Sequence, residues 1–279
     1  MATTNCLADG WTTIRNGSVW LDTNGDTVQA HAPGFLHYGG RWYMIGEDRS
    51  DSWHPDVNMY SSDDLVHWRF ETKIIRNGVT VPELGTRRFI ERAKLMHNPR
   101  TGKFVVWCHW EGPRYAASEA ACFSADSICG PYRLEWSGRP LGVKSRDCNV
   151  FVDNDGEAYF VSTTEENTNI GLFRLADDYL SAESHVCLMP GLRREAPVIV
   201  RHDNLYYMLS SACTGGFFLL AKAVNVLGIG TSYAVFTGIG IVGTAIEGVL
   251  LLDEGMSALK LISLVLLCGG IIGLKKEEK

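Results

Sequence analysis

The chain changes composition abruptly about three quarters of the way along, and this break limits its fold more than any other feature. All 8 Trp and all 8 His of the 279 residues lie before residue 203. The stretch 217–274 has only five charged residues and is aliphatic and rich in glycine. One globular domain seldom changes so sharply, so the sequence predicts two unrelated parts, 1–215 and 216–279, that meet near Gly215–Gly216.

Overall composition excludes several classes of protein. Hydrophobic residues make up 46%, charged residues 21%, and the formal net charge is −6. These values argue against a disordered chain and a basic nucleic-acid binder, so no nucleic-acid partner is expected. The 8 Cys are scattered without metal-ligand spacing, which predicts free thiols and neither a metal nor a cofactor. The N-terminus lacks the pattern of a signal peptide, so the first part is expected to be cytoplasmic.

A pattern recurs four times in the first part, at 31–44, 91–106, 147–160 and 195–208. Each copy has an apolar stretch, a turn rich in Gly, Asn or Asp, and then an aromatic stretch, as a β-hairpin does. Spacings of roughly 50–60 residues with several strands each are typical of propeller blades. A β-sandwich with chance similarity is the alternative. A carboxylate opens three copies (Glu91, Asp147 and Glu195), and in a propeller the innermost strands would bring these groups to one central pocket.

Seven motifs in residues 11–215 resemble glycoside hydrolase family 43, most of all its branch containing exo-β-1,3-galactanases. The resemblance implies a five-bladed propeller that hydrolyses glycosidic bonds with inversion, on β-galactosides or related sugars of plant polysaccharide side chains. Because it covers three blades and part of a fourth, we expect an incomplete propeller with impaired activity. The motifs are Val28-Gln-Ala-His31, Met44-Ile-Gly-Glu47, Tyr60-Ser-Ser-Asp-Asp-Leu-Val-His-Trp68, Ile90-Glu-Arg92, Ser145-Arg-Asp147, Arg194-Glu-Ala-Pro197 and Ser211-Ala-Cys-Thr-Gly215.

The resemblance also implies roles for individual carboxylates. Inverting hydrolysis needs an acid that protonates the leaving oxygen and a base that activates water. By the family pattern Glu195 is the acid and Asp147 holds it and tunes its pKa. Glu91 and Glu47 are expected to hydrogen-bond sugar hydroxyls. Glu91 and Glu195 each adjoin an arginine in sequence, so a structural ion pair is the alternative for both.

The catalytic base is left unassigned. Most of the family has an Asp before the Pro that opens the first blade, and this chain has Ala32 before Pro33. The galactanase-like branch also departs there and places its base-like residue in a later blade, beyond the part that this chain resembles.

Four further residues are candidates for sugar contact. Trp107 and Trp110 lie on one predicted strand, where a ring could stack on a sugar, although core packing is the alternative for at least one of them. Gln29 and His31 could line the pocket floor, and a hydrogen-bonded structural His is the alternative. The segment Asp153–Gly156 opens like a calcium loop but lacks the later ligands, which favours a hairpin turn.

The second part contains two apolar stretches, at 229–252 and at 261–274. The first is long enough to span a bilayer as a helix and the second is borderline. Lys275, Lys276 and Lys279 follow, and positive charges favour the cytoplasmic side. The sequence therefore predicts an α-helical membrane segment with about two spans and a cytoplasmic C-terminus. A Gly238–Gly243 match to the dinucleotide-binding pattern is discounted, because it lies inside an apolar span.

Residues 217–275 resemble the small multidrug resistance transporters, especially their guanidinium-exporting relatives. The resemblance rests on Leu220-Ala-Lys-Ala, 230–240, 243–246 and 269–275. It implies the end of the second helix, then the third and fourth, with dimerisation through the helices. The first helix, which bears the family's coupling Glu, has no counterpart, and Glu247 does not match it.

Three hypotheses follow from these two resemblances: a family 43 hydrolase, a membrane transporter fragment with an unusual N-terminal domain, or a non-functional chimera. The carboxylates favour the first. The absent first helix argues against transport, and the absent blades favour an inactive hybrid.

Overall fold

The computed structural model describes residues 13–14, 18–50, 56–85, 87–211, 257 and 263. The chain divides into two units, Met1–Ser211 and Ala212–Lys279, and every element named below belongs to the first. These elements are β-strands and short 3-10 turns, which confirms the all-β prediction for the first part. The predicted membrane spans lie, apart from Ser263, outside the described residues, among which no helix is long and apolar enough to cross a bilayer.

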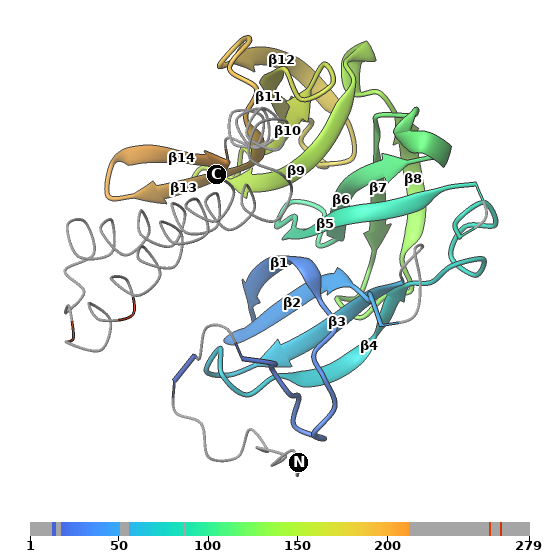
Figure 1. Cartoon of the computed structure of the whole chain (residues 1–279), viewed down its shortest axis with the longest axis vertical. Coiled ribbons are helices and arrows are strands. Elements are labelled where there is room, and N and C mark those ends of the chain that lie inside the picture. Colours follow the sequence, from blue (N-terminus) through green and yellow to red (C-terminus); the bar gives the residue numbers. More distant parts are fainter. Residues whose placement is uncertain are drawn as a thin grey trace, which may run out of the picture. The chain divides into compact units, whose positions relative to one another are not determined.

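Antiparallel sheets follow one another along the chain, and in each the strand order is the sequence order (Figure 1). Three sheets have four strands and the last is a hairpin. The strands are β1 (His31–Tyr38), β2 (Arg41–Glu47), β3 (Val57–Ser62), β4 (Arg69–Ile75), β5 (Phe89–His97), β6 (Phe104–Glu111), β7 (Glu119–Ala125), β8 (Arg133–Gly138), β9 (Ser145–Val152), β10 (Ala158–Thr164), β11 (Asn169–Leu175), β12 (Ala182–Leu188), β13 (Glu195–His202) and β14 (Leu205–Ser211).

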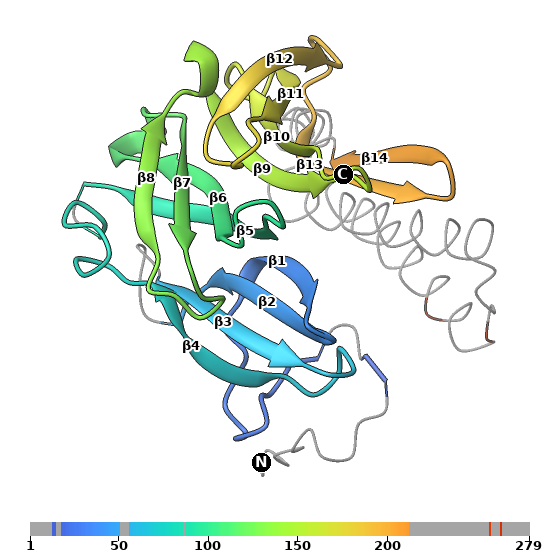
Figure 2. The same ribbon diagram turned by 180° about the vertical axis from the view of Figure 1, so that it is seen from behind.

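The first strands of successive sheets lie next to one another. β1 contacts β5, β5 contacts β9, and β9 contacts β13. Figures 1 and 2 show β1, β5 and β9 on the inner side of their sheets, with β4, β8 and β12 farther out. Groups at the beginning of these inner strands are therefore brought together from distant parts of the sequence.

The hairpin turns form where the sequence predicts them. β1 and β2 are joined through Gly39 and Gly40, whose φ values of 58° and 80° suit a two-residue turn that side chains disfavour. The β5–β6, β9–β10 and β13–β14 hairpins confirm the other three predicted turns. The segment Asp153–Gly156 is thus a hairpin turn, and the Asp153 carboxylate accepts a hydrogen bond from Arg201 Nη1 at 2.6 Å.

Each inner strand has a β-bulge near its beginning, where two of its residues oppose one residue of the second strand. Glu91 and Glu195 are the last paired residues before their bulges. Asp147 lies inside its bulge, and Ser145 occupies the position equivalent to Glu91. The predicted register, which aligned Asp147 with Glu91, is therefore wrong by two residues. The bulge pairs are Ala32–Pro33, Arg92–Ala93, Arg146–Asp147 and Ala196–Pro197.

The sheets pack through buried apolar side chains, and β6 shows why this sequence makes an interior strand. All eight of its residues are buried, and most are aromatic or β-branched. Cys108 on β6, Cys122 and Cys148 are buried thiols, whereas Cys129 and Cys187 are exposed, and all five are free. The prediction of free thiols is confirmed for the described cysteines.

Trp107 and Trp110 belong to this core, and the prediction that they contact sugar is wrong. Trp107 is 0% exposed and Trp110 is 1% exposed, so neither offers a ring face to a ligand. The Trp107 ring lies 4.9 Å from that of Phe160, and its Nε1 donates to the Tyr179 carbonyl at 2.8 Å. Trp110 packs against Phe123. The physical reason is that both faces of β6 are covered: Trp110 lies in one buried apolar cluster and Trp107 lies in another.

Replacing Trp107 with alanine should lower the free energy of unfolding by about 3–5 kcal/mol, as is usual for large buried aromatic residues. The loss combines a cavity beside Phe160 with the unpaired Tyr179 carbonyl. Urea denaturation of the full chain, followed by circular dichroism, measures it. Trp107→Phe, which keeps most of the volume, should lose less. A loss below about 1 kcal/mol in the alanine variant would contradict the core role.

Candidate active site

Glu47 is the most completely bonded carboxylate at the beginning of the inner strands. It ends β2, and its side chain is 0% exposed. Oε1 accepts the Arg92 backbone N–H at 2.5 Å, and Oε2 accepts Arg49 Nε at 2.9 Å. His31 Nδ1 lies 3.1 Å from Oε2. Direct contact between Glu47 and a sugar would therefore require Arg49 to move.

Glu91 begins the cluster on β5 and is partly open, with 16% side-chain exposure. Oε1 accepts Tyr115 Oη at 2.7 Å and Arg49 Nη2 at 3.2 Å. His109 Nδ1 lies 3.3 Å from Oε2. Burial by itself would raise the pKa of Glu91, but its electrostatic interactions with His109 and Arg49 and the hydrogen bond from Tyr115 outweigh burial and lower the pKa to about 2. Glu91 is thus an ionised acceptor at neutral pH.

Arg92, on β5, connects two carboxylates that come from the sheets on either side of its own. Its Nε lies 2.7 Å from Asp147 Oδ1 on β9, while its backbone N–H binds Glu47 of β2. Its φ of 54° belongs to the bulge of β5 and directs the backbone N–H toward β2. Arg92, the sequence neighbour of Glu91, thus pairs with Asp147, whereas Glu91 does form an ion pair, with Arg49 at 3.2 Å.

Glu195 lies at the first position of β13, the next inner strand. Its Oε1 accepts Asn167 Nδ2 at 2.7 Å. Within the described part of the chain, no ion pair or hydrogen bond joins Glu195 to Asp147, Glu91 or Glu47. The structure thus links Glu47, Glu91 and Asp147 through two arginines and places Glu195 on the neighbouring strand.

The two remaining candidates are anchored at the edge of this cluster. The His31 side chain is 61% exposed and lies beside Glu47. Gln29 is half-buried, and its backbone makes two hydrogen bonds. The backbone N–H donates to Tyr60 Oη at 2.9 Å, and the backbone carbonyl accepts a hydrogen bond from Asn58 Nδ2 at 3.0 Å. His31 is therefore the more open of the two to a ligand.

The sequence did not predict the basic residues that contact the carboxylates of the site. Arg49 and His109 contact the predicted carboxylates directly, and Glu111 lies 3.0 Å behind His109. Tyr115 reaches Glu91 from the short 3-10 turn η2 (Pro113–Tyr115). The proximity of His109 and Glu111 on one strand is the one local signal that could have indicated this pair.

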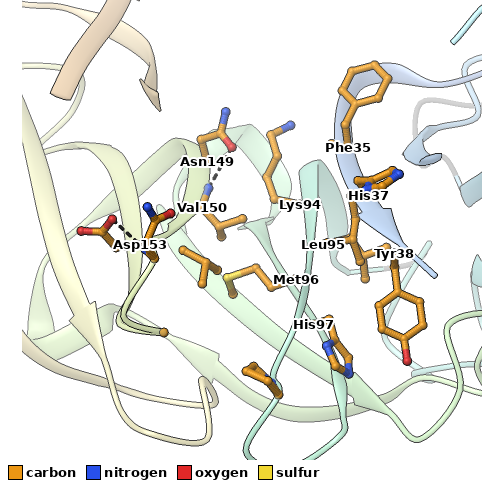
Figure 3. A pocket seen from close by; sticks show the side chains of 16 residues that line it. Phe35, His37, Tyr38, Lys94, Leu95, Met96, His97, Asn149, Val150 and Asp153 are labelled. Carbon is orange, nitrogen blue, oxygen red and sulfur yellow. Dashed lines mark hydrogen bonds between the residues drawn. The ribbon is translucent and has the colours of Figure 1, made fainter. Parts of the chain in front are cut away.

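A separate hollow of about 460 Å³ lies farther along β1, β5 and β9 (Figure 3). None of the predicted site residues lines it. Lys94, at its edge, donates from Nζ to the carbonyls of Ala32 at 2.7 Å and Pro33 at 3.0 Å, which ties the β1 bulge to β5. Burial lowers the pKa of Lys94 to about 8.

A pair of carboxyl groups that flank the scissile bond is the catalytic apparatus of most glycoside hydrolases. This site brings acidic groups together from several β-sheets, as an enzyme of that class requires. Residues 27–218 match the family model of glycosyl hydrolases family 43, and the chain belongs to this family. Residues 203–267 match the model of the small multidrug resistance proteins. The two recognised similarities are thus confirmed, and the matched regions overlap at 203–218.

Solved structures similar to the first part include several galactanases. An exo-β-1,3-galactanase from Clostridium thermocellum is 38% identical, with a TM-score of 0.69, over 73% of this chain and 47% of its own. One from Phanerochaete chrysosporium with β-1,3-galactotriose is 34% identical, with a TM-score of 0.69, over 73% and 48%. A β-1,3-galactosidase with galactodeoxynojirimycin is 32% identical, with a TM-score of 0.66, over 73% and 74%. The chain spans about half of each galactanase.

Relatives of the second part are guanidinium exporters. One from Yersinia pseudotuberculosis is 55% identical over 64 residues, which are 23% of this chain and 62% of the exporter. One from Salmonella typhimurium is 56% identical over 57 residues, or 20% and 54%. The chain therefore matches somewhat more than half of each exporter.

Proposed function

We propose that residues 27–218 are a glycoside hydrolase module that binds the terminal galactose of β-1,3-linked galactosides and cleaves it slowly, with inversion. One observation carries the proposal: Arg49 and Arg92 join Glu47, Glu91 and Asp147, which come from three different sheets. The galactanase similarity supports galactosides as the substrate class.

The proposal includes the arrangement of the sheets as blades of a propeller. Three four-stranded meanders and a hairpin are the first three and a half blades of a five-bladed propeller, with β1, β5, β9 and β13 around the axis. The contacts between successive inner strands support this arrangement. The substrate lies where these strands begin, because the carboxylates lie there.

Each carboxylate then has a chemical role. Glu195 protonates the leaving oxygen, and Asp147, on the neighbouring inner strand, positions it as the sugar binds. Glu91, ionised at neutral pH, accepts hydrogen bonds from sugar hydroxyls, and Glu47 holds Arg49 against it. The roles assigned here do not include a general base, and we therefore propose slow turnover.

Calorimetric titration of the full chain with β-1,3-galactobiose tests the proposal. Binding is expected, and Glu91→Gln should weaken it by about tenfold, since a hydrogen bond to a charged group contributes roughly 1.5–3 kcal/mol. Proton NMR of the first product anomer tests inversion. No binding by the folded chain, or equal binding by Glu91→Gln, would reject the assigned site.

A second function concerns membranes, and the match of residues 203–267 to the small multidrug resistance model favours it. We propose that this segment anchors the chain in a membrane and pairs with the segment of a second copy, with the first part on the cytoplasmic side. The apolar stretches at 229–252 and 261–274 would supply the spans.

After expression in bacteria, the chain is expected to remain in the membrane fraction in alkaline carbonate and to enter solution with detergent. Spanning helices resist carbonate because their apolar surface stays in the bilayer. Immunoblotting of both fractions measures this. A chain ending at Ser211 is the control and should not remain with washed membranes. Release of the full chain by carbonate would contradict anchoring.

A further inference from the structure

A buried Glu-His-Glu chain extends from β6 to the candidate site. Its inner end is Glu111, which is 0% exposed. The Glu111 carboxylate accepts the backbone N–H groups of Gly112 and Ala117, each at 2.8 Å, and that of Ser118 at 3.2 Å. Burial would raise the pKa of Glu111, but His109 and these N–H groups outweigh it and lower the pKa to about 2. Glu111 is thus a fixed negative charge.

His109 lies two residues earlier on the same strand, so the two side chains are on the same face. It is 1% exposed, and its Nε2 lies 3.0 Å from Glu111 Oε2. Since an ionised carboxylate can only accept, Nε2 carries a proton. The other ring nitrogen, Nδ1, is buried without a hydrogen bond of good geometry and lies 3.3 Å from Glu91 Oε2. That approach is attractive only if Nδ1 also carries a proton.

Glu91 is the outer end of this Glu-His-Glu series and the most exposed of the three residues. It pairs directly with His109 across the β5–β6 ladder, so the backbone sets their separation. Along the series Glu111, His109, Glu91, Arg49 and Glu47 the charges alternate in sign when His109 is protonated. Loss of the Nδ1 proton would place a nitrogen lone pair against the Glu91 carboxylate.

We propose that His109, oriented by Glu111, is a positioning residue that holds the Glu91 carboxylate in place for galactose hydroxyls while the imidazole is protonated. The role in sugar binding rests on the proposed function. The coupling between His109 and Glu91 does not, because it follows from the distances alone.

The sign of the pH dependence follows from the charges around His109. Burial lowers the pKa of His109, but its interactions with Glu111 and Glu91 outweigh burial and raise it above its ordinary value. The protonated ring is therefore favoured below that raised pKa, and its contribution is lost as the pH increases through it. Galactoside binding is expected to be level below this raised pKa and to weaken as the pH increases through it.

Other charged or titratable groups face Glu111, His109 and Glu91 from the neighbouring elements. Arg49 follows β2, Tyr115 lies in η2 with its ring 6.3 Å from that of His109, and Arg146 of β9 reaches the Tyr115 carbonyl and Ser118. Burial raises the pKa of the Cys148 thiol to about 12, and burial with the Glu91 hydrogen bond raises that of Tyr115. His109 is the titratable histidine in contact with Glu91. Two other described groups of the wider site can change charge between pH 5 and 9: Lys94, whose pKa burial lowers to about 8, bonds the Ala32 and Pro33 carbonyls, and His31 contacts Glu47, so neither contacts Glu91.

The test combines binding and titration on the purified full chain in detergent. Calorimetry with β-1,3-galactobiose from pH 5 to 9 is expected to show a loss of affinity of roughly tenfold on the alkaline side. In Glu111→Gln, which keeps the size of the side chain, the loss should begin at lower pH. His109→Gln should bind weakly at every pH. His202→Gln, a change at an exposed histidine outside the cluster, should match the unchanged chain.

A second measurement needs no ligand. NMR of chains labelled at the histidine Cε1, with His109 assigned from the His109→Gln spectrum, gives its titration directly. Glu91→Gln and Glu111→Gln should each lower the pKa of His109. An unshifted titration in Glu91→Gln would overturn the proposal, as would pH-independent affinity. Coupling by NMR without galactoside binding at any pH would reject the proposed function and leave the His109–Glu91 coupling in place.

Discussion

Replacing Glu195 with glutamine is expected to lower the release of galactose from β-1,3-galactobiose by about 10²–10⁴-fold, the usual contribution of general acid catalysis. Glutamine keeps the shape of the side chain and can still accept the Asn167 hydrogen bond, but it has no proton for the leaving oxygen. Chromatography after overnight incubation with micromolar full chain measures the product.

The matched control for this prediction is Glu183→Gln on β12. Glu183 is an exposed glutamate paired with Arg174 on the adjacent strand, away from the inner strands. Its replacement should leave the rate unchanged. Equal rates for Glu195→Gln and the unchanged chain would show that another group is the acid.

The full chain is expected to hydrolyse β-1,3-galactobiose about 10²–10⁴-fold more slowly than the Clostridium thermocellum galactanase. The roles that we propose include an acid and sugar-binding carboxylates but no general base. A general base usually accelerates such a reaction by this factor, so its contribution would be lost. Parallel assays at equal protein concentration, with affinity measured by calorimetry, separate slow chemistry from weak binding.

Azide distinguishes a missing base from a damaged site. The azide anion attacks the anomeric carbon without losing a proton, the glycosidic bond breaks, and Glu195 protonates the leaving oxygen. Azide is therefore expected to increase substrate consumption and to form α-galactosyl azide. Turnover near that of the galactanase without azide would contradict the proposed impairment.

Short sequence motifs predicted the features that depend on a few neighbouring residues, such as the hairpin turns. A hairpin turn depends on a few backbone angles, and Gly39 and Gly40 have the positive φ values that such a turn needs. The four predicted hairpins therefore form where expected. The similarity to two unrelated families was equally visible, because each similarity rests on residue types and motifs within its own stretch of sequence.

The prediction of sugar contact by Trp107 and Trp110 failed for a physical reason. An aromatic ring on a strand serves equally well in a core or against a sugar, and only neighbouring strands decide which. Here β6 lies inside its sheet, and the residues packed on its two faces enclose both rings.

By itself, the sequence determined that the first part is built of β-hairpins, that acidic residues lie near the beginning of three of its repeats, and that an unrelated apolar segment follows. These properties depend on residue type and spacing. Tertiary structure alone decided that Asp147 lies inside a bulge, that Arg92 joins it to Glu47, and that His109 faces Glu91. The bulge and the pair of His109 and Glu91 depend on ladder register within a single hairpin, which a shift of one residue would change. The Arg92 contacts depend on long-range packing, because Glu47 and Asp147 belong to other sheets.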